Sequence, residues 1–239
     1  YMMRAAVLDT LAGIGESFQA VTDILTQVTA EMNGMVLSMM EARIEFEKFY
    51  ELTDQAEAVE SQIILIGEAF AFTAEQALTA GARMAQLSTL FGPETVPLGT
   101  ELGMTFGLIG GMETEDAMKK MISLQQQTNF MLDDYTAAQF RQLPVQQRLN
   151  IMRQETMETL DKLNSIENTS VATMEQMINV MNQFASQAHL TGESIEAMAA
   201  MSAVLIEAGE EQNKGGRAIR MFYARLGGDI SGARGSLEQ

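Results

Sequence analysis

The chain of 239 residues contains no cysteine and no tryptophan, and it has only three prolines and one histidine. Without cysteine it forms no disulfide and performs no thiolate chemistry. A single histidine, His189, excludes a metal site built from several histidines of one chain. The shortage of proline and aromatic residues, together with 20 methionines, favours helices over strands. We therefore expect an all-α protein without a bound metal or cofactor.

Positive charge is also scarce, because 15 Lys and Arg face 32 Asp and Glu, for a formal net charge of −17. An acidic surface repels phosphate, so we expect no stable binding of nucleic acid. The exception is the stretch 212–239, where five basic residues outnumber two acidic ones. Lys214, Arg217, Arg220 and Arg225 either complement helix C-termini or dock onto an acidic partner. Both interpretations stay open.

The longest pattern is a heptad repeat of apolar residues that runs from Val7 to Phe70 and resets once, between Phe49 and Leu52. Such spacing keeps one apolar seam against a partner helix. One continuous helix over 7–70 would be about 96 Å long at roughly 1.5 Å per residue. Asn33-Gly34 offers an alternative, a helix end that would fold the segment into a hairpin. The seam predicts a homo-oligomer, a trimer, whose contacts include Val7, Leu11, Ile14, Phe18, Val21, Leu25, Val28 and Met32.

Downstream of the repeat, capping residues and breakers predict a series of shorter helices. Thr73 with Gln76 forms a capping box. Thr114, Thr169-Ser170 and Thr191 are further predicted caps. The predicted helices span 74–91, a segment after Pro97, 115–131, 134–142, 144–165, 171–187, 192–209 and 213–226. We therefore divide the chain into a long coiled-coil-like segment (1–72), a multi-helix domain punctuated by glycine (73–228) and a loose tail (229–239).

Three segments, 72–75, 112–116 and 190–193, each place an apolar residue beside a threonine and an acidic residue before a predicted helix. Shared capping chemistry explains this likeness as well as an internal duplication does.

Residues 92–112 are apolar and rich in glycine, with Gly99, Gly103, Gly107 and Gly111 spaced four apart. Small residues at this spacing let helices approach closely, both in membranes and in tightly packed cores. The segment is shorter than the roughly 20 residues that a membrane span needs. A buried helix is therefore the preferred interpretation, and entry into a membrane is the alternative.

No set of residues predicts catalysis. Glu68, Glu75 and Glu101 lie near apolar stretches, but nothing in the sequence pairs them as a hydrolase would require. His189 stands before a predicted helix-to-helix turn, where a C-terminal cation is the simplest interpretation. The glycines around Gly110 are not followed by the lysine of a phosphate-binding loop. We expect a protein that is not an enzyme.

The most specific pattern covers residues 180–228. A stretch of glutamine and small residues (183–188) leads to a threonine-capped helix alternating Ala with Leu or Met (191–206). An Ala208-Gly209 turn follows, then a helix that holds Gly-Arg-Ala-Ile-Arg (216–220) and ends at Arg225-Leu226. This order resembles the core region of phage tail tape-measure proteins, and 74–112 is similar to the upstream part of that core. The sequence departs from the family pattern at the acidic residues around the turn, at Lys214 and at Ile219.

The resemblance implies a long helical protein in the virion, within the lumen of the tail tube or at the tail tip. Such a protein sets tail length and leaves during DNA ejection. The implied partners are other copies of the chain, tail-tube and baseplate or tail-tip proteins, and the host membrane at ejection; assembly takes place in the host cytoplasm. The start, Tyr1-Met2-Met3-Arg4, indicates a piece of a longer polypeptide. The competing hypothesis is a membrane-active helical protein that forms or aids a channel for genome delivery.

Overall fold

The computed structural model describes residues 26, 27, 30, 34, 36–44, 53–132 and 135–228. Helices are the only regular elements in these ranges, which confirms the all-α prediction. Residues 36–44 are helical. The elements that follow are α2 (Thr53–Ala69), α3 (Ala74–Ala85), α4 (Ser88–Phe91), η1 (Pro93–Thr95), α5 (Val96–Ile109), α6 (Thr114–Thr128), η2 (Phe130–Leu132), α7 (Ala137–Gln142), α8 (Val145–Glu167), α9 (Met174–Met181), α10 (Ala185–Leu190), α11 (Ile195–Glu207) and α12 (Gln212–Gly228).

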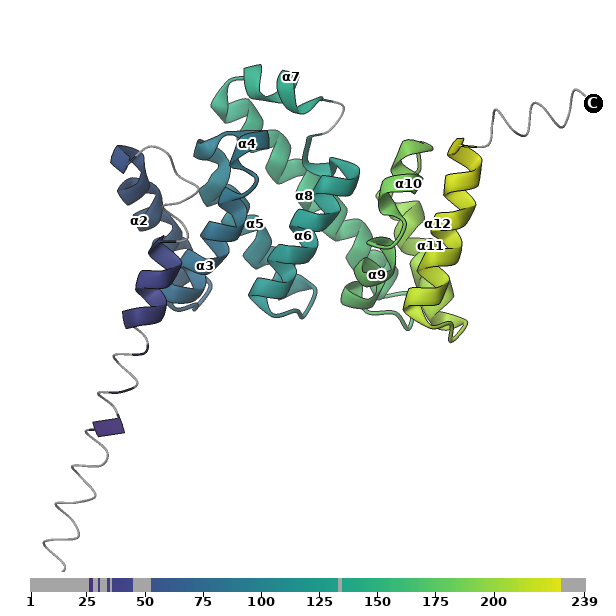
Figure 1. The fold of residues 1–239 in the computed structure, drawn as a ribbon, viewed down its shortest axis with the longest axis horizontal. Helices are drawn as coiled ribbons and strands as arrows, with labels where there is room; N and C mark the ends of the chain where they lie inside the picture. The colour runs from purple at the N-terminus through teal and green to yellow at the C-terminus, as the bar shows by residue number, and fades with distance from the viewer. Residues whose placement is uncertain are drawn as a thin grey trace, which may run out of the picture.

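The helices form a row of pairs, each pair joined by a short turn: α2 with α3, α5 with α6, α8 with α9, and α11 with α12. Neighbouring pairs contact one another, since α3 packs on α5 and α6, α5 on α8, and α8 and α9 on α11. The row begins at α2 and ends at α12, so these two helices lie at opposite ends (Figure 1). Because each pair buries its apolar faces against the next, one core runs through the row.

Four of the turns share one geometry, in which a left-handed residue ends the first helix and the next N–H donates to the carbonyl five residues back. The left-handed residues are Ala71, Gly111, Gly192 and Gly209, with φ of 59°, 61°, 85° and 71°. The matching bonds are Phe72 to Gly67 (2.9 Å), Met112 to Gly107 (2.9 Å), Glu193 to Ala188 (3.1 Å) and Glu210 to Leu205 (3.2 Å). This recurring turn accounts for the likeness among the three sequence segments.

The capping box of Thr73 and Gln76 is confirmed, and Thr136 and Thr173 head two further boxes. Three predicted caps were wrong. At α6 the cap position is Glu113 and not Thr114. At α9 it is Thr173 and not Thr169-Ser170, and at α11 it is Ser194 and not Thr191. At α6 and α11 the turn decides the cap, because Glu113 and Ser194 directly follow the helix-ending bond and take an extended conformation. Thr191 instead ends α10, and Thr114 is already the first residue of α6.

Two long predicted helices are each divided in the structure. The stretch 74–91 forms α3 and α4, separated by a turn at Gln86 and Leu87, and 171–187 contributes to α9 and α10. Leu87, Phe91 and Phe184 are all buried, so each turn brings an additional apolar side chain into the core. Tertiary packing therefore overrides local helix propensity at both places.

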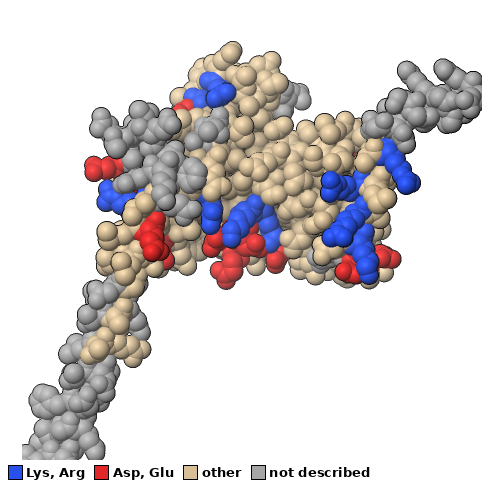
Figure 2. Space-filling model, viewed as in Figure 1, with Lys and Arg blue, Asp and Glu red and all other residues tan. Residues whose placement is uncertain are grey.

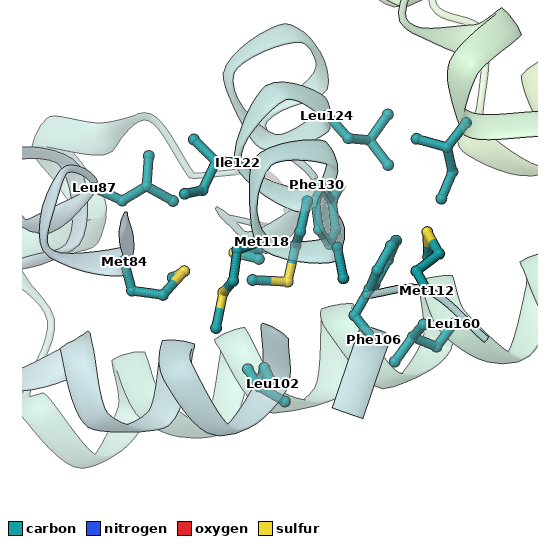
Figure 3. Close-up of a cluster of buried hydrophobic side chains, with 14 of the residues drawn as sticks. Met84, Leu87, Leu102, Phe106, Met112, Met118, Ile122, Leu124, Phe130 and Leu160 are labelled. Atoms are coloured by element: carbon teal, nitrogen blue, oxygen red, sulfur yellow. The ribbon is translucent and has the colours of Figure 1, made fainter. Parts of the chain in front are cut away.

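The glycine-rich α5 is a buried helix, as preferred from its sequence. A Cβ atom added to Gly99 would meet the Met84 side chain, and one added to Gly103 would meet Met118. Figure 3 shows these methionine side chains beside Leu102 of α5, within the cluster that joins α3, α5 and α6. The absent side chains of α5 thus make room for methionines from both neighbours.

The predicted oligomer seam, from Val7 to Met32, lies outside the described residues. Farther along the heptad pattern, Ile63 is fully buried, and Val59, Ile66 and Phe70 pack against the same core. The helices that contact this part of the pattern are α3 and α5 of the same chain.

Candidate interaction surfaces

Three glutamates line a hollow on the described surface. Glu75 near the start of α3 and Glu113 and Glu115 near the start of α6 line a shallow hollow of about 260 Å³. Glu115 accepts hydrogen bonds from Lys119 (2.7 Å) and Arg83 (3.3 Å). The bond from Lys119 and its positive charge lower the pKa of Glu115, which therefore stays ionised. Among the described residues, no group of carboxylates or histidines has the arrangement of a metal site.

The remaining residues considered for chemistry are separate from that hollow. Glu101 of α5 binds the guanidinium of Arg153 through two hydrogen bonds of 2.9 and 3.0 Å. Glu68 is exposed on α2, and His189 is exposed in the last turn of α10, where a helix C-terminal cation was expected. Because Glu101 is held by an arginine, its carboxylate serves to join α5 to α8.

Two buried cations were not predicted from the sequence. Arg148 of α8 pairs with Glu94 and donates a hydrogen bond of 2.6 Å to the carbonyl of Phe91, so it holds the turn between α4 and α5. Lys120 of α6 pairs with Asp116 and lies 3.2 Å from Glu175 of α9. The spacing of Asp116 and Lys120 is the only sequence signal for either site. Each cation also contacts an element more than 50 residues away in the sequence, which no local pattern reveals.

The predicted docking residues Lys214, Arg217, Arg220 and Arg225 all lie on α12 and are all exposed. Figure 2 shows basic side chains gathered over this end of the row. Lys214 pairs with Glu211 at 2.6 Å, whereas no described residue forms an ion pair with the three arginines. We call the outward side of α12, with these four cations, the basic face.

The basic face also presents apolar side chains. Met221 and Phe222 are each 58% exposed, although both are large and apolar. On the opposite side of the helix, Tyr223 is buried and stacks on Phe184 at 6.2 Å between ring centroids. Tyr223 therefore anchors α12 to the core of the row, while the outward side of the helix combines positive charge with exposed apolar surface.

The helix 36–44 exposes a second apolar stripe, made of Val36, Leu37, Met40 and Ile44. Its other side contacts the row, since Ala42 is buried and Arg43 pairs with Glu60 of α2 at 3.3 Å. The exposed stripe lies on a different side of the helix from the heptad position Ala42.

Among the described residues, no helix is both long and apolar enough to cross a membrane. The segment for which membrane entry was the alternative, α5, buries most of its apolar side chains against neighbouring helices, although Leu108 and Ile109 at its C-terminal end are exposed.

Comparison with known families finds that residues 136–239 match the family described as phage-related minor tail protein. The match covers α7 to α12 and includes 180–228, the segment with the most specific resemblance, whereas 74–112 lies outside it. No curated protein and no solved structure matches the chain. The family match supports a phage tail protein with a structural role in the virion.

Proposed function

We propose that this chain is the core region of a tape-measure protein, which occupies the lumen of the phage tail tube, sets tail length and leaves during DNA ejection. The observation that carries the proposal is the minor tail family match over residues 136–239, which contains the whole of α7 to α12. The chain acts by shape and contact, without catalysis.

The charge of the chain supports a place in the tube. With a net charge of −17 the protein repels DNA, which must later travel through the same lumen. A tail protein that bound DNA tightly at this place would obstruct its passage.

The packing supports release. In the described part of the chain, successive helix pairs are linked in order, by contacts such as those of α3 with α5, α5 with α8 and α9 with α11, and a row built in this way can come apart pair by pair. The core is rich in methionine, including Met104, Met131, Met152 and Met177, and flexible methionine side chains tolerate repacking.

Self-association through the N-terminal segment is the second part of the proposal. Val7 to Met32 would form the contacts of a trimer, and tail-tube and tail-tip proteins would surround it. The exposed stripe of Val36, Leu37, Met40 and Ile44 supports contacts with other chains at this end.

The test uses the phage that encodes the chain. Intact particles and particles emptied of DNA are purified, and the chain is quantified in their tails against a tube protein as the retained control. We expect the chain in intact tails and its loss from emptied ones. An in-frame helical insertion of about 40 residues should also lengthen the tail by roughly 60 Å, at 1.5 Å per residue. Unchanged amounts after ejection, with unchanged tail length, would rule the proposal out.

A further inference from the structure

We propose that copies of this chain associate head to tail, with the basic face of α12 in one copy docked on the outward side of α2 in the next. The proposal does not depend on the tail role. It gives the exposed surfaces of α2 and α12, the helices at the two ends of the row, a binding partner in another copy of the chain.

Each end helix leaves one of its sides exposed. On α2, Ile63 is buried against the row and a Cβ atom on Gly67 would lie 2.4 Å from the Cβ of Ala77, so this side packs tightly on α3. On α12, Gly215, Gly216 and Tyr223 are buried in the same way. The outward side of α12 has no neighbouring helix among the described residues, whereas α2 is contacted by the helix 36–44 through the Arg43–Glu60 ion pair and still exposes Glu57, Leu65 and Glu68 (Figure 1).

Rows of stacked helices usually end in a polar surface, because an apolar end would attract further layers. Here both ends expose large apolar side chains. Leu65 of α2 is 64% exposed, beside the small residues Ala58, Ser61 and Ala69, and the opposite end exposes Met221 and Phe222. Small residues on one helix and large ones on the other allow close packing between them.

The charges of the two ends are complementary. The sequence of α2 contains four acidic residues and no basic one, whereas that of α12 contains four basic residues and no acidic one. Glu60 of α2 is already paired with Arg43, but Glu57 and Glu68 are exposed on the outward side. On α12, Arg217, Arg220 and Arg225 have no ion-pair partner among the described residues.

This distribution decides which ends meet. Two acidic ends repel each other, and so do two basic ends, whereas an acidic end attracts a basic one. A contact between two different surfaces is heterologous, so repetition leads to an open filament or a closed ring. A second copy suits α12 better than nucleic acid does, because the rest of the chain is strongly acidic.

The experiment is sedimentation of the full chain over a range of concentrations at about 0.1 M and about 1 M salt. The Debye length falls from roughly 10 Å to roughly 3 Å between these conditions, which weakens ion pairs at an exposed interface. We expect the average mass to grow with concentration at the lower salt and this growth to vanish at the higher salt. Association through an apolar N-terminal seam would not weaken with salt, so the two kinds of contact are distinguishable.

Two double variants supply the decisive comparison. Arg217→Glu with Arg220→Glu removes the net positive charge of α12, and Glu57→Lys with Glu68→Lys removes the net negative charge of α2. Each variant alone should lose the salt-sensitive growth. An equimolar mixture should regain salt-sensitive association, because the native acidic end of one variant then meets the native basic end of the other. Circular dichroism checks that both variants keep the helical fold.

Arg141→Glu with Lys162→Glu is the matched control for the basic-end variant. Both residues are exposed and lie on α7 and α8, away from the ends of the row, and the net charge changes by the same amount. We expect this control to associate like the native chain. The proposal is overturned if the native chain shows no salt-sensitive growth, if the basic-end variant still shows it, if the control loses it, or if the mixture fails to regain it.

Discussion

Replacing Gly67 by alanine should destabilise the row where α2 packs on α3. A Cβ atom at position 67 would lie 2.4 Å from the Cβ of Ala77 and 3.6 Å from its Cα. Carbon atoms in contact are ordinarily about 3.5–4.0 Å apart, so the two helices must separate by roughly 1 Å. Ala77 has no flexible side chain that could move away, and it is fully buried.

Two effects of this substitution oppose each other. Alanine within a helix is favoured over glycine by up to about 1 kcal/mol. Overpacking a rigid contact costs about 1–3 kcal/mol. The contact is between backbone-attached atoms, so we expect the upper part of this cost and a net loss of about 1–2 kcal/mol. For a domain of this size that loss lowers the melting temperature by about 2–8 °C.

The assay is thermal unfolding followed by circular dichroism, with two comparisons. Gly34→Ala is the matched control, since Gly34 is helical and nothing lies within 4 Å of an added Cβ. It should be neutral or slightly stabilising. Adding Ala77→Gly to Gly67→Ala removes the clashing methyl group, so the double variant should recover stability relative to the sum of the two single changes. Gly67→Ala as stable as Gly34→Ala would refute the reasoning.

Further predictions concern single polar contacts and use the same unfolding assay. Thr173→Ala removes a capping box and should cost about 1 kcal/mol, whereas Thr169→Ala, outside the cap, should cost less. Arg148→Met leaves Glu94 without its buried partner and should cost about 3 kcal/mol, against less than about 1 kcal/mol for the exposed Arg153→Met. The lowered pKa of Glu115 stabilises the fold above the ordinary glutamate pKa of about 4.3, and this stabilisation is lost as pH falls through the lower folded value. Glu115→Gln should therefore be less stable than the native chain at pH 7, with the difference closing in acid. Equal costs within either pair, or a difference that does not depend on pH, would contradict these expectations.

The predictions that needed only local chemistry succeeded in part. The helical class followed from composition, and the box at Thr73 followed from four consecutive residues. Helical spacing puts Met174, Met177, Ile178 and Met181 on one face, and all are buried. Such patterns repeat within one or two helical turns, so the sequence contains all the information they require.

Cap positions were predicted less well where a turn, and not the nearest threonine, decides which residue is extended. Thr173 and Ser194 were missed because several nearby residues have equal intrinsic ability to cap. Similarly, the glycine spacing in α5 predicted close approach, but it did not identify Met84 and Met118 as the side chains that fill the space.

By itself, then, the sequence determined the helices, most of their apolar faces and the basic character of 214–225, because these depend on neighbours along the chain. Only the tertiary structure decided that α2 and α12 stand at opposite ends of one row, with opposite charge and uncovered apolar side chains. It also decided that Arg148 and Lys120 join elements that are distant in the sequence. The physical reason is that burial and pairing between distant segments depend on how the helices stack, which spacing along the chain does not specify.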